Sequence, residues 1–169
     1  MGELTWSNEF SVGIEEIDDQ HKMLFELVNR LFQAAVKRED QQLTVEVLKS
    51  LVDYTKTHFS LEERLLEASG YHGLPGHRED HQRFIDKVNA IAQKFHVEDR
   101  SVTFELINFL KNWLQNHIRH SDMEYAAHLA RTGFTTDGWA SGARTAVQAQ
   151  GIQTRPWWRF WGEAVTATR

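Results

Sequence analysis

The chain has 169 residues, of which 41% are apolar, and this length and composition fit one domain with a substantial core. Its formal net charge of −5 excludes the basic surface that nucleic-acid binding requires, so we expect no nucleic acid as a partner. The absence of cysteine excludes disulfides, thiolate catalysis and iron–sulfur clusters, and it suits a reducing compartment. Neither a signal peptide nor an apolar run of roughly 20 residues is recognisable, so we expect a cytoplasmic protein.

The first 17 residues show no regular period, yet they contain several large apolar side chains among polar ones. Such side chains need cover from solvent. We therefore expect an ordered N-terminal arm that packs on the domain through Trp6, Phe10, Val12, Ile14 and Ile17.

Four segments follow in which apolar residues recur every three or four positions, which is typical of amphipathic helices. We expect helices over residues 18–37, 41–68, 76–95 and 102–130, with Gly133 as the stop after the last one. Helices of this length joined by short loops predict an all-α fold, an up-down-up-down four-helix bundle with a left-handed twist. We assign the bundle domain to residues 1–132.

Residues 133–169 differ in composition and are expected to form a C-terminal extension. They are rich in Gly, Ala, Thr and Arg, and four arginines against two acidic residues make the segment +2. Pro156 suits the first position of a short helix. The aromatic side chains after it are expected to dock on the bundle itself, on a protein partner or on a membrane surface; they are Trp157, Trp158, Phe160 and Trp161.

Polar residues interrupt the apolar stripes of all four predicted helices. His58 and Glu62 are four residues apart, as are His77 and His81. Each pair shares a face, because four residues turn a helix by about 400°. One histidine on such a stripe is usually a hydrogen-bonded core residue, but burying many without partners would cost about 1–3 kcal/mol for each unsatisfied group. We therefore predict a shared metal centre rather than separately hydrogen-bonded histidines, built from His21, His58, Glu62, His77, His81 and His117.

A seventh ligand on the last helix is ambiguous from spacing. Asp122 follows His117 by five residues, or about 500°, which leaves it about 140° away from the same face. Spacing alone favours His120 or Glu124. Asp122 fits if the helix widens locally into a π-bulge, or if its side chain reaches in from the flank.

The order H, HxxxE, HxxxH and HxxxxD along the chain resembles the hemerythrin family, in particular its bacterial members. The flanking words TWSNEFSVGIEEIDDQH, HFSLEE and WLQNHIRHSDMEY resemble the family as well. The resemblance covers roughly residues 4–131 and selects Asp122 as the seventh ligand. One departure is Leu65-Leu66, where many relatives have Leu-Met.

The resemblance implies two non-haem iron ions, and imidazole and carboxylate ligands suit iron. It assigns three histidines to one iron and two to the other, which then keeps an open position for O2. It also implies an apolar O2 pocket and a supporting role for Tyr125. The assignments are His77, His81 and His117 for the full iron, His21 and His58 for the open one, Glu62, Asp122 and an oxo or hydroxo group as bridges, and Phe59, Trp113, Leu114 and Ile118 for the pocket.

The function implied by the resemblance is reversible O2 binding, for storage or for delivery to oxygen-using enzymes, and not enzymatic turnover. One alternative is an O2 or redox sensor that acts through the C-terminal tail. Another is a di-iron enzyme that acts on peroxide or nitric oxide. Outside the motif, we expect solvated or merely supporting roles for His72, His96, His120 and His128.

Overall fold

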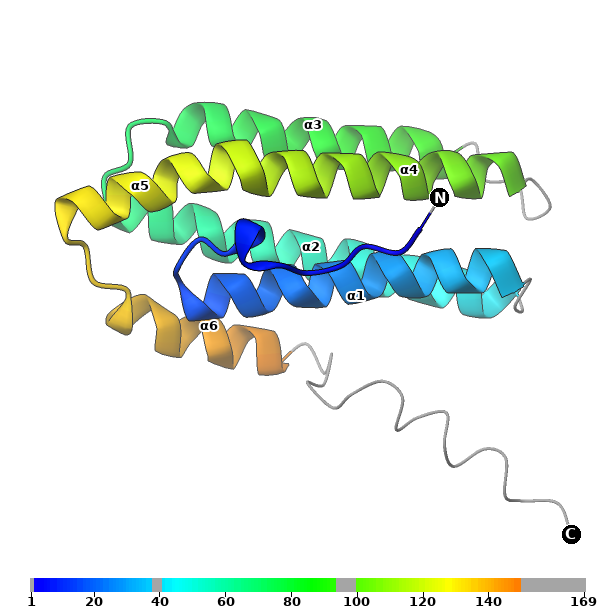
Figure 1. Cartoon of the computed structure of the whole chain (residues 1–169), viewed down its shortest axis with the longest axis horizontal. Coiled ribbons are helices and arrows are strands. Elements are labelled where there is room, and N and C mark those ends of the chain that lie inside the picture. The colour runs from blue at the N-terminus through cyan, green and yellow to red at the C-terminus, as the bar shows by residue number, and fades with distance from the viewer. Residues whose placement is uncertain (1, 38–40, 94–99, 150–169) are drawn as a thin grey trace, which may run out of the picture.

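The computed structural model describes residues 2–37, 41–93 and 100–149. Its core is a four-helix bundle in which α1 packs on α2 and α4, and α3 packs on the same two helices (Figure 1). The fourth helix of the bundle is continuous but has three consecutive parts: α4, a π-helical turn η2 and α5. The elements are α1 (Glu15–Lys37), α2 (Gln41–Ala68), α3 (Leu74–Gln93), α4 (Arg100–His117), η2 (Ile118–Asp122) and α5 (Met123–Thr132).

The predicted fold class is confirmed, and the helix ends differ in understandable ways. α2 has the expected bounds. α1 begins three residues earlier than expected, at Glu15, with acidic residues in its first turn, where they complement the helix dipole. α3 begins at Leu74 and includes Pro75 in its first turn, because a missing backbone N–H costs nothing there. α5 ends as expected before Gly133, which adopts a φ of 67° that favours glycine.

The N-terminal arm is ordered, as predicted, and runs along α1 (Figure 1). The side-chain amide of Asn29 makes two hydrogen bonds to the backbone of Leu4. Leu4 N–H donates to Oδ1 at 2.7 Å, and Nδ2–H donates to the Leu4 carbonyl at 2.8 Å. Further along, Asp18 accepts hydrogen bonds from the Ser11 hydroxyl at 2.6 Å and the Val12 N–H at 2.8 Å. These bonds fix the register of the arm on α1.

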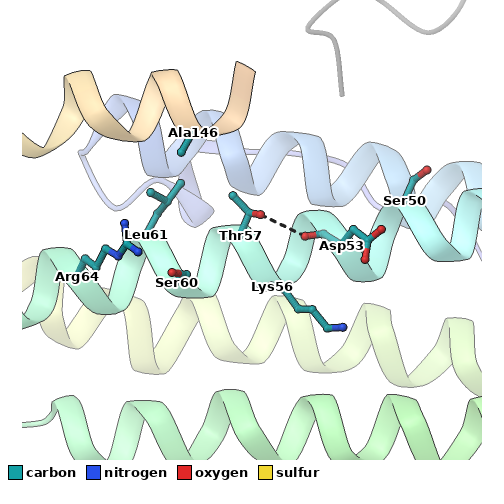
Figure 2. A pocket seen from close by; sticks show the side chains of 8 residues that line it. All are labelled: Ser50, Asp53, Lys56, Thr57, Ser60, Leu61, Arg64 and Ala146. Carbon is teal, nitrogen blue, oxygen red and sulfur yellow. Dashed lines mark hydrogen bonds between the residues drawn. The ribbon is translucent and has the colours of Figure 1, made fainter. Parts of the chain in front are cut away.

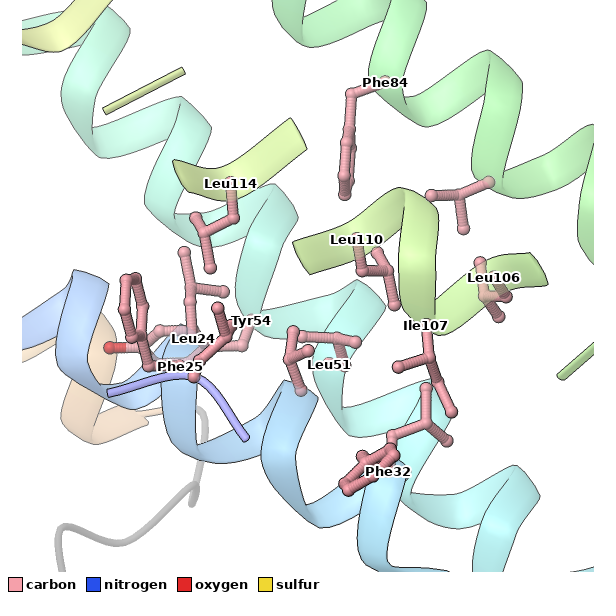
Figure 3. Close-up of a cluster of buried hydrophobic side chains, with 14 of the residues drawn as sticks. Leu24, Phe25, Phe32, Leu51, Tyr54, Phe84, Leu106, Ile107, Leu110 and Leu114 are labelled. Atoms are coloured by element: carbon pink, nitrogen blue, oxygen red, sulfur yellow. The ribbon is translucent and has the colours of Figure 1, made fainter. Parts of the chain in front are cut away.

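Two hydrophobic clusters flank the middle of the bundle. The larger one fills the end where α1, α2, α3 and α4 meet, and Figure 3 shows its side chains pointing into the space between these helices. The smaller one includes Ile17, Leu65 and Tyr125 near the opposite end. Along α1, which contributes side chains to both clusters, His21 lies between Ile17 and Leu24. The polar positions of the stripes therefore fall between two apolar layers.

A further helix, α6 (Asp137–Ala149), lies within the predicted C-terminal extension and packs on α1 and α2. Trp139 Nε1–H donates to the backbone carbonyl of Leu61 at 2.8 Å, and Arg144 pairs with Glu16. Figure 2 shows Ala146 of α6 and Leu61 of α2 on the two sides of the groove that separates these helices. The expected helix at Pro156 and the aromatic residues after it lie outside the described residues. None of the helices in the described ranges has the length and hydropathy that a membrane span requires.

Replacing Gly73 by alanine should destabilise the protein, because a Cβ there would lie 2.5 Å from Cζ of the buried Tyr71 ring. Overpacking of this kind costs about 1–3 kcal/mol. Gly76→Ala is the matched control: nothing lies within 4 Å of its Cβ position, so the free energy of unfolding should stay unchanged or rise slightly. Urea unfolding followed by circular dichroism measures both. Equal stability of the two variants would contradict the predicted clash.

Candidate metal centre

The structure brings the seven predicted side chains together in the middle of the bundle. They come from α1, α2, α3, α4 and the end of η2, and each is at most 6% exposed. Among the described residues, two sets of three or more are placed to hold an ion. One set is Glu62, His77, His81 and His117, and the other is His21, His58 and Glu62.

The first set surrounds one oxygen of Glu62. Nε2 of His77 lies 3.1 Å from Glu62 Oε2, and Nε2 of His81 lies 3.3 Å from the same oxygen. His117 completes the set, with its Nε2 3.1 Å from Nε2 of His81. Three imidazole nitrogens therefore converge on one carboxylate, as they would around a common cation.

The second set contains two imidazoles, from α1 and α2. Nε2 of His58 lies 3.9 Å from Glu62 Oε2, and the rings of His21 and His58 meet edge to face at a centroid distance of 4.9 Å. Glu62 belongs to both sets. The arrangement is thus a three-histidine position and a two-histidine position that share a carboxylate.

Asp122 connects the same two sets from the other side. Its Oδ1 lies 3.1 Å from Nε2 of His117, and its Oδ2 lies 3.3 Å from Nε2 of His21. The π-helical turn of residues 118–122 explains this position, because a π turn takes about one residue more than an α turn and so returns a residue five positions on toward the same face. His120 and Glu124, which spacing alone favoured, are both exposed.

Several polar atoms of the centre have no hydrogen-bond partner among the described residues. Both ring nitrogens of His21 and both carboxylate oxygens of Asp122 are buried without a hydrogen bond, although Nε2 and Oδ2 approach to 3.3 Å. Buried polar groups are otherwise almost always satisfied. Nitrogen and carboxylate oxygen atoms left free in this way fit a bound cation, which would satisfy them together.

The surroundings of both carboxylates of the centre favour their ionised forms. Burial by itself would raise the pKa of Glu62, but the nearby imidazole of His58 and hydrogen bonds from His77 and His81 hold that pKa well below its ordinary value. Burial and the neighbouring Glu62 likewise act to raise the pKa of Asp122, but His117 and His21 lower it to about 2. Burial lowers the pKa of His58 to about 3, so this imidazole is neutral and its nitrogen free to bind a metal.

Tyr125 supports the centre, as the sequence suggested. It is fully buried, and its hydroxyl donates a hydrogen bond to Glu62 Oε1 at 2.5 Å. Burial, followed by the charge of Glu62, raises the pKa of Tyr125 well above its ordinary value, so the phenol keeps its proton. This bond fixes one oxygen of Glu62 while the other faces the histidines.

Sequence reasoning missed two residues that bind the outer ring nitrogens of histidines in the centre. Nδ1–H of His58 donates to Oε1 of Gln20 at 2.9 Å, and Nδ1–H of His81 donates to Oε1 of Glu63 at 2.8 Å. Gln20 directly precedes His21 in the chain, and Glu63 directly follows Glu62. Consecutive residues on a helix point about 100° apart. Gln20 and Glu63 therefore point away from their own neighbours in the motif, and each contacts a histidine of another helix. Adjacency to a motif residue was the available signal.

Aromatic rings cover the three-histidine set. Phe59 stacks on His81 with a centroid distance of 3.6 Å, and Trp113 stacks on His117 at 4.2 Å. Leu114 and Ile118 are buried in the same hydrophobic cluster as Phe59. Two of the predicted pocket residues, Phe59 and Trp113, therefore lie directly on histidines of the centre, and the other two belong to the same hydrophobic cluster.

The remaining features lie away from the centre. His120 is exposed and its Nδ1–H donates to the carbonyl of Asn116 at 2.8 Å, whereas His72 and His128 pack beside Tyr71. His96 lies outside the described residues. The groove of about 580 Å³ between α2 and α6 (Figure 2) is lined by the outer face of α2, and none of the seven centre residues lines it.

Comparison with known proteins agrees with this geometry. Residues 12–129 match the family described as the hemerythrin HHE cation binding domain. A bacteriohemerythrin of Pseudomonas aeruginosa (strain LESB58) is 38% identical over 125 residues, which cover 74% of this chain and 80% of that protein. A bacteriohemerythrin of Methylococcus capsulatus is 30% identical over 131 residues, covering 77% of this chain and 99% of that protein.

A crystal structure of wild-type hemerythrin superposes with a TM-score of 0.65 at 29% identity, covering 73% of this chain and 95% of the other. The similarity therefore extends from the motif to the whole bundle. A four-helix bundle with a buried cluster of histidine and carboxylate side chains, matched in sequence and in structure over most of its length, places this chain in the hemerythrin family.

Proposed function

We propose that this protein binds O2 reversibly at a pair of non-haem iron ions, for storage or for delivery to oxygen-using enzymes. The supporting observation is the division of the buried ligands into a three-histidine and a two-histidine set around shared carboxylates. In the proposed assignment, His77, His81 and His117 hold one iron, His21 and His58 hold the other, and Glu62 and Asp122 bridge them with an oxo or hydroxo group. Iron bound in this way would supply the electrons that hold O2 and recover them on release.

The protein's own contribution is to keep the centre dry and short of protons. Phe59 and Trp113 cover ligand rings with apolar faces, and Leu114 and Ile118 are buried beside them. The Tyr125 hydroxyl directs its proton to Glu62 and retains it. The apolar cover and the engaged phenol proton limit proton delivery to bound oxygen, which supports reversible binding over turnover.

The deciding experiment is anaerobic. The protein is reduced, its iron per chain is counted, and visible spectra are recorded through cycles of O2 addition and removal. We expect a pair of irons and a charge-transfer band that appears with O2 and disappears without it. Irons that oxidise once and remain oxidised would contradict the proposal and favour the enzyme or redox-sensor alternatives.

Replacing Leu114 by glutamine should speed autoxidation by about tenfold or more, because a polar side chain admits water to the apolar shell that protects the metal. Leu114 is 6% exposed. The matched control is Leu114→Met, a volume-conserving apolar change that should leave the rate close to wild type. The decay of the oxygenated spectrum at constant temperature measures both, and equal rates for the two variants would count against a protective role.

A sensor role is the second candidate, and the packing of α6 favours it. Trp139 of α6 donates its hydrogen bond to the carbonyl of Leu61, the residue directly before Glu62. A change at the centre therefore has a short path to the helix that leads into the tail. Trp139→Phe should leave O2 binding intact but alter partner capture by the tail if the protein signals; unchanged capture would exclude this path.

A further inference from the structure

The outer nitrogens of His81 and His58 have different hydrogen-bond partners. Each ring directs Nε2 toward Glu62 Oε2, at 3.3 Å for His81 and 3.9 Å for His58. Each ring then uses Nδ1–H as a donor, to Glu63 Oε1 at 2.8 Å and to Gln20 Oε1 at 2.9 Å respectively. The two histidines belong to different sets, His81 to the three-histidine set and His58 to the two-histidine set.

The two acceptors differ in charge and surroundings. Glu63 is a carboxylate, its side chain is 25% exposed, and Arg78 Nε–H donates to its other oxygen at 3.2 Å. Arg78 also reaches Glu67, with Nη2 3.5 Å from Oε2, so the carboxylate of Glu63 is held in place from the solvent side. Gln20 is a neutral amide that is 3% exposed, and its oxygen accepts the bond from His58 inside the bundle.

This difference changes how strongly each imidazole donates to a metal. A carboxylate that accepts the outer N–H draws the proton toward itself and makes the ring more electron-rich, and hydrogen bonds to charged acceptors are about twice as strong as neutral ones. A more electron-rich ligand favours the higher-charged metal ion. A neutral amide orients the ring but increases its donor strength less.

We propose that Glu63 and Gln20 are positioning residues that make the two metal positions electronically unequal. Glu63 strengthens the preference of the three-histidine position for ferric iron, and Gln20 keeps the two-histidine position closer to the ferrous state. This inference rests on the proposed iron pair, and it supplies a reason for reversibility: the position where O2 would bind and leave is the one whose histidine has the uncharged partner.

The test exchanges charge while keeping shape. Glu63→Gln retains an oxygen acceptor for His81 and removes the charge; Gln20→Glu does the reverse for His58. The control is Glu67→Gln, which changes an exposed neighbour that pairs with Arg78. The iron-loaded proteins are titrated anaerobically with a reductant in the presence of redox mediators, after the iron per chain has been counted.

We expect Glu63→Gln to raise the midpoint potential of the ferric/ferrous couple and Gln20→Glu to lower that potential. A change of about 10–100-fold in the relative affinity for ferric and ferrous iron corresponds to about 60–120 mV, at 59 mV per tenfold for one electron. Glu67→Gln should leave the potential unchanged. Shifts no larger than the control, or shifts of the same sign in both variants, would overturn the proposal.

A second variant at Gln20 and the exclusion of O2 separate the possible outcomes. If Gln20→Glu does not fold, Gln20→Met replaces it and should raise the potential, because His58 then lacks an acceptor; an unchanged potential would refute the role of Gln20. All potentials are measured without O2. Failure of wild-type protein to release O2 would therefore refute the proposed function, while the inequality of the two positions would be decided separately by the titration.

Discussion

Replacing Glu62 by glutamine should abolish binding of the metal pair. Glu62 is shared by both sets of histidines, and both of its oxygens are engaged, Oε1 by Tyr125 and Oε2 by His77 and His81. An amide removes the charge and turns either an N–H₂ group or a weaker acceptor toward these partners. Mutation of a residue that supports a metal ligand typically lowers metal affinity by about 10–100-fold. The loss of a bridging ligand itself should lower it further.

The measurement is iron per chain after anaerobic reconstitution and desalting. Glu67→Gln is the control, since it makes the same change on the same helix at a side chain that is 66% exposed. Far-UV circular dichroism establishes that the variant is helical, which separates loss of metal from loss of fold. A Glu62→Gln protein with the full iron content of wild type would refute the bridging assignment.

Removal of the metal should lower the melting temperature by about 8–16 °C. A ligand that binds only the folded state at 1,000 times its dissociation constant contributes about 4 kcal/mol, and each kcal/mol shifts the melting point of a chain of this size by about 2–4 °C. The metal-free centre also leaves the ring nitrogens of His21 and the oxygens of Asp122 buried without hydrogen bonds among the described residues. Burial removes these groups from water without replacing their hydrogen bonds, and this desolvation cost lowers the stability of the folded protein.

Differential scanning calorimetry of the iron-loaded and chelator-treated protein measures this shift. The Glu62→Gln variant provides the internal control, because a protein that no longer holds the metal pair should show no further change on chelation. Re-addition of ferrous iron under anaerobic conditions should restore the wild-type melting point. Identical melting points before and after chelation would show that the buried cluster contributes to the fold without a metal.

The four bundle helices and the clustering of the centre residues at one level follow from the sequence alone. The three-four spacing of apolar residues requires one buried face per helix, and His58 with Glu62, or His77 with His81, occupy that face because four residues nearly complete a turn. Once the helices pack through these faces, the polar positions must meet. The bounds of α2 and the stop at Gly133 likewise follow from local chemistry.

The apolar spacing leaves open how the cluster is completed, and helix packing settles it. Asp122 enters it through a π-helical turn, and a change in backbone hydrogen-bond register leaves no mark in the hydrophobic period. Gln20 and Glu63 act on histidines of other helices, so their roles depend on helix packing and not on their sequence neighbours. α6 docks through Trp139 and small buried alanines onto α1 and α2, a fit that depends on the surface already formed by those helices.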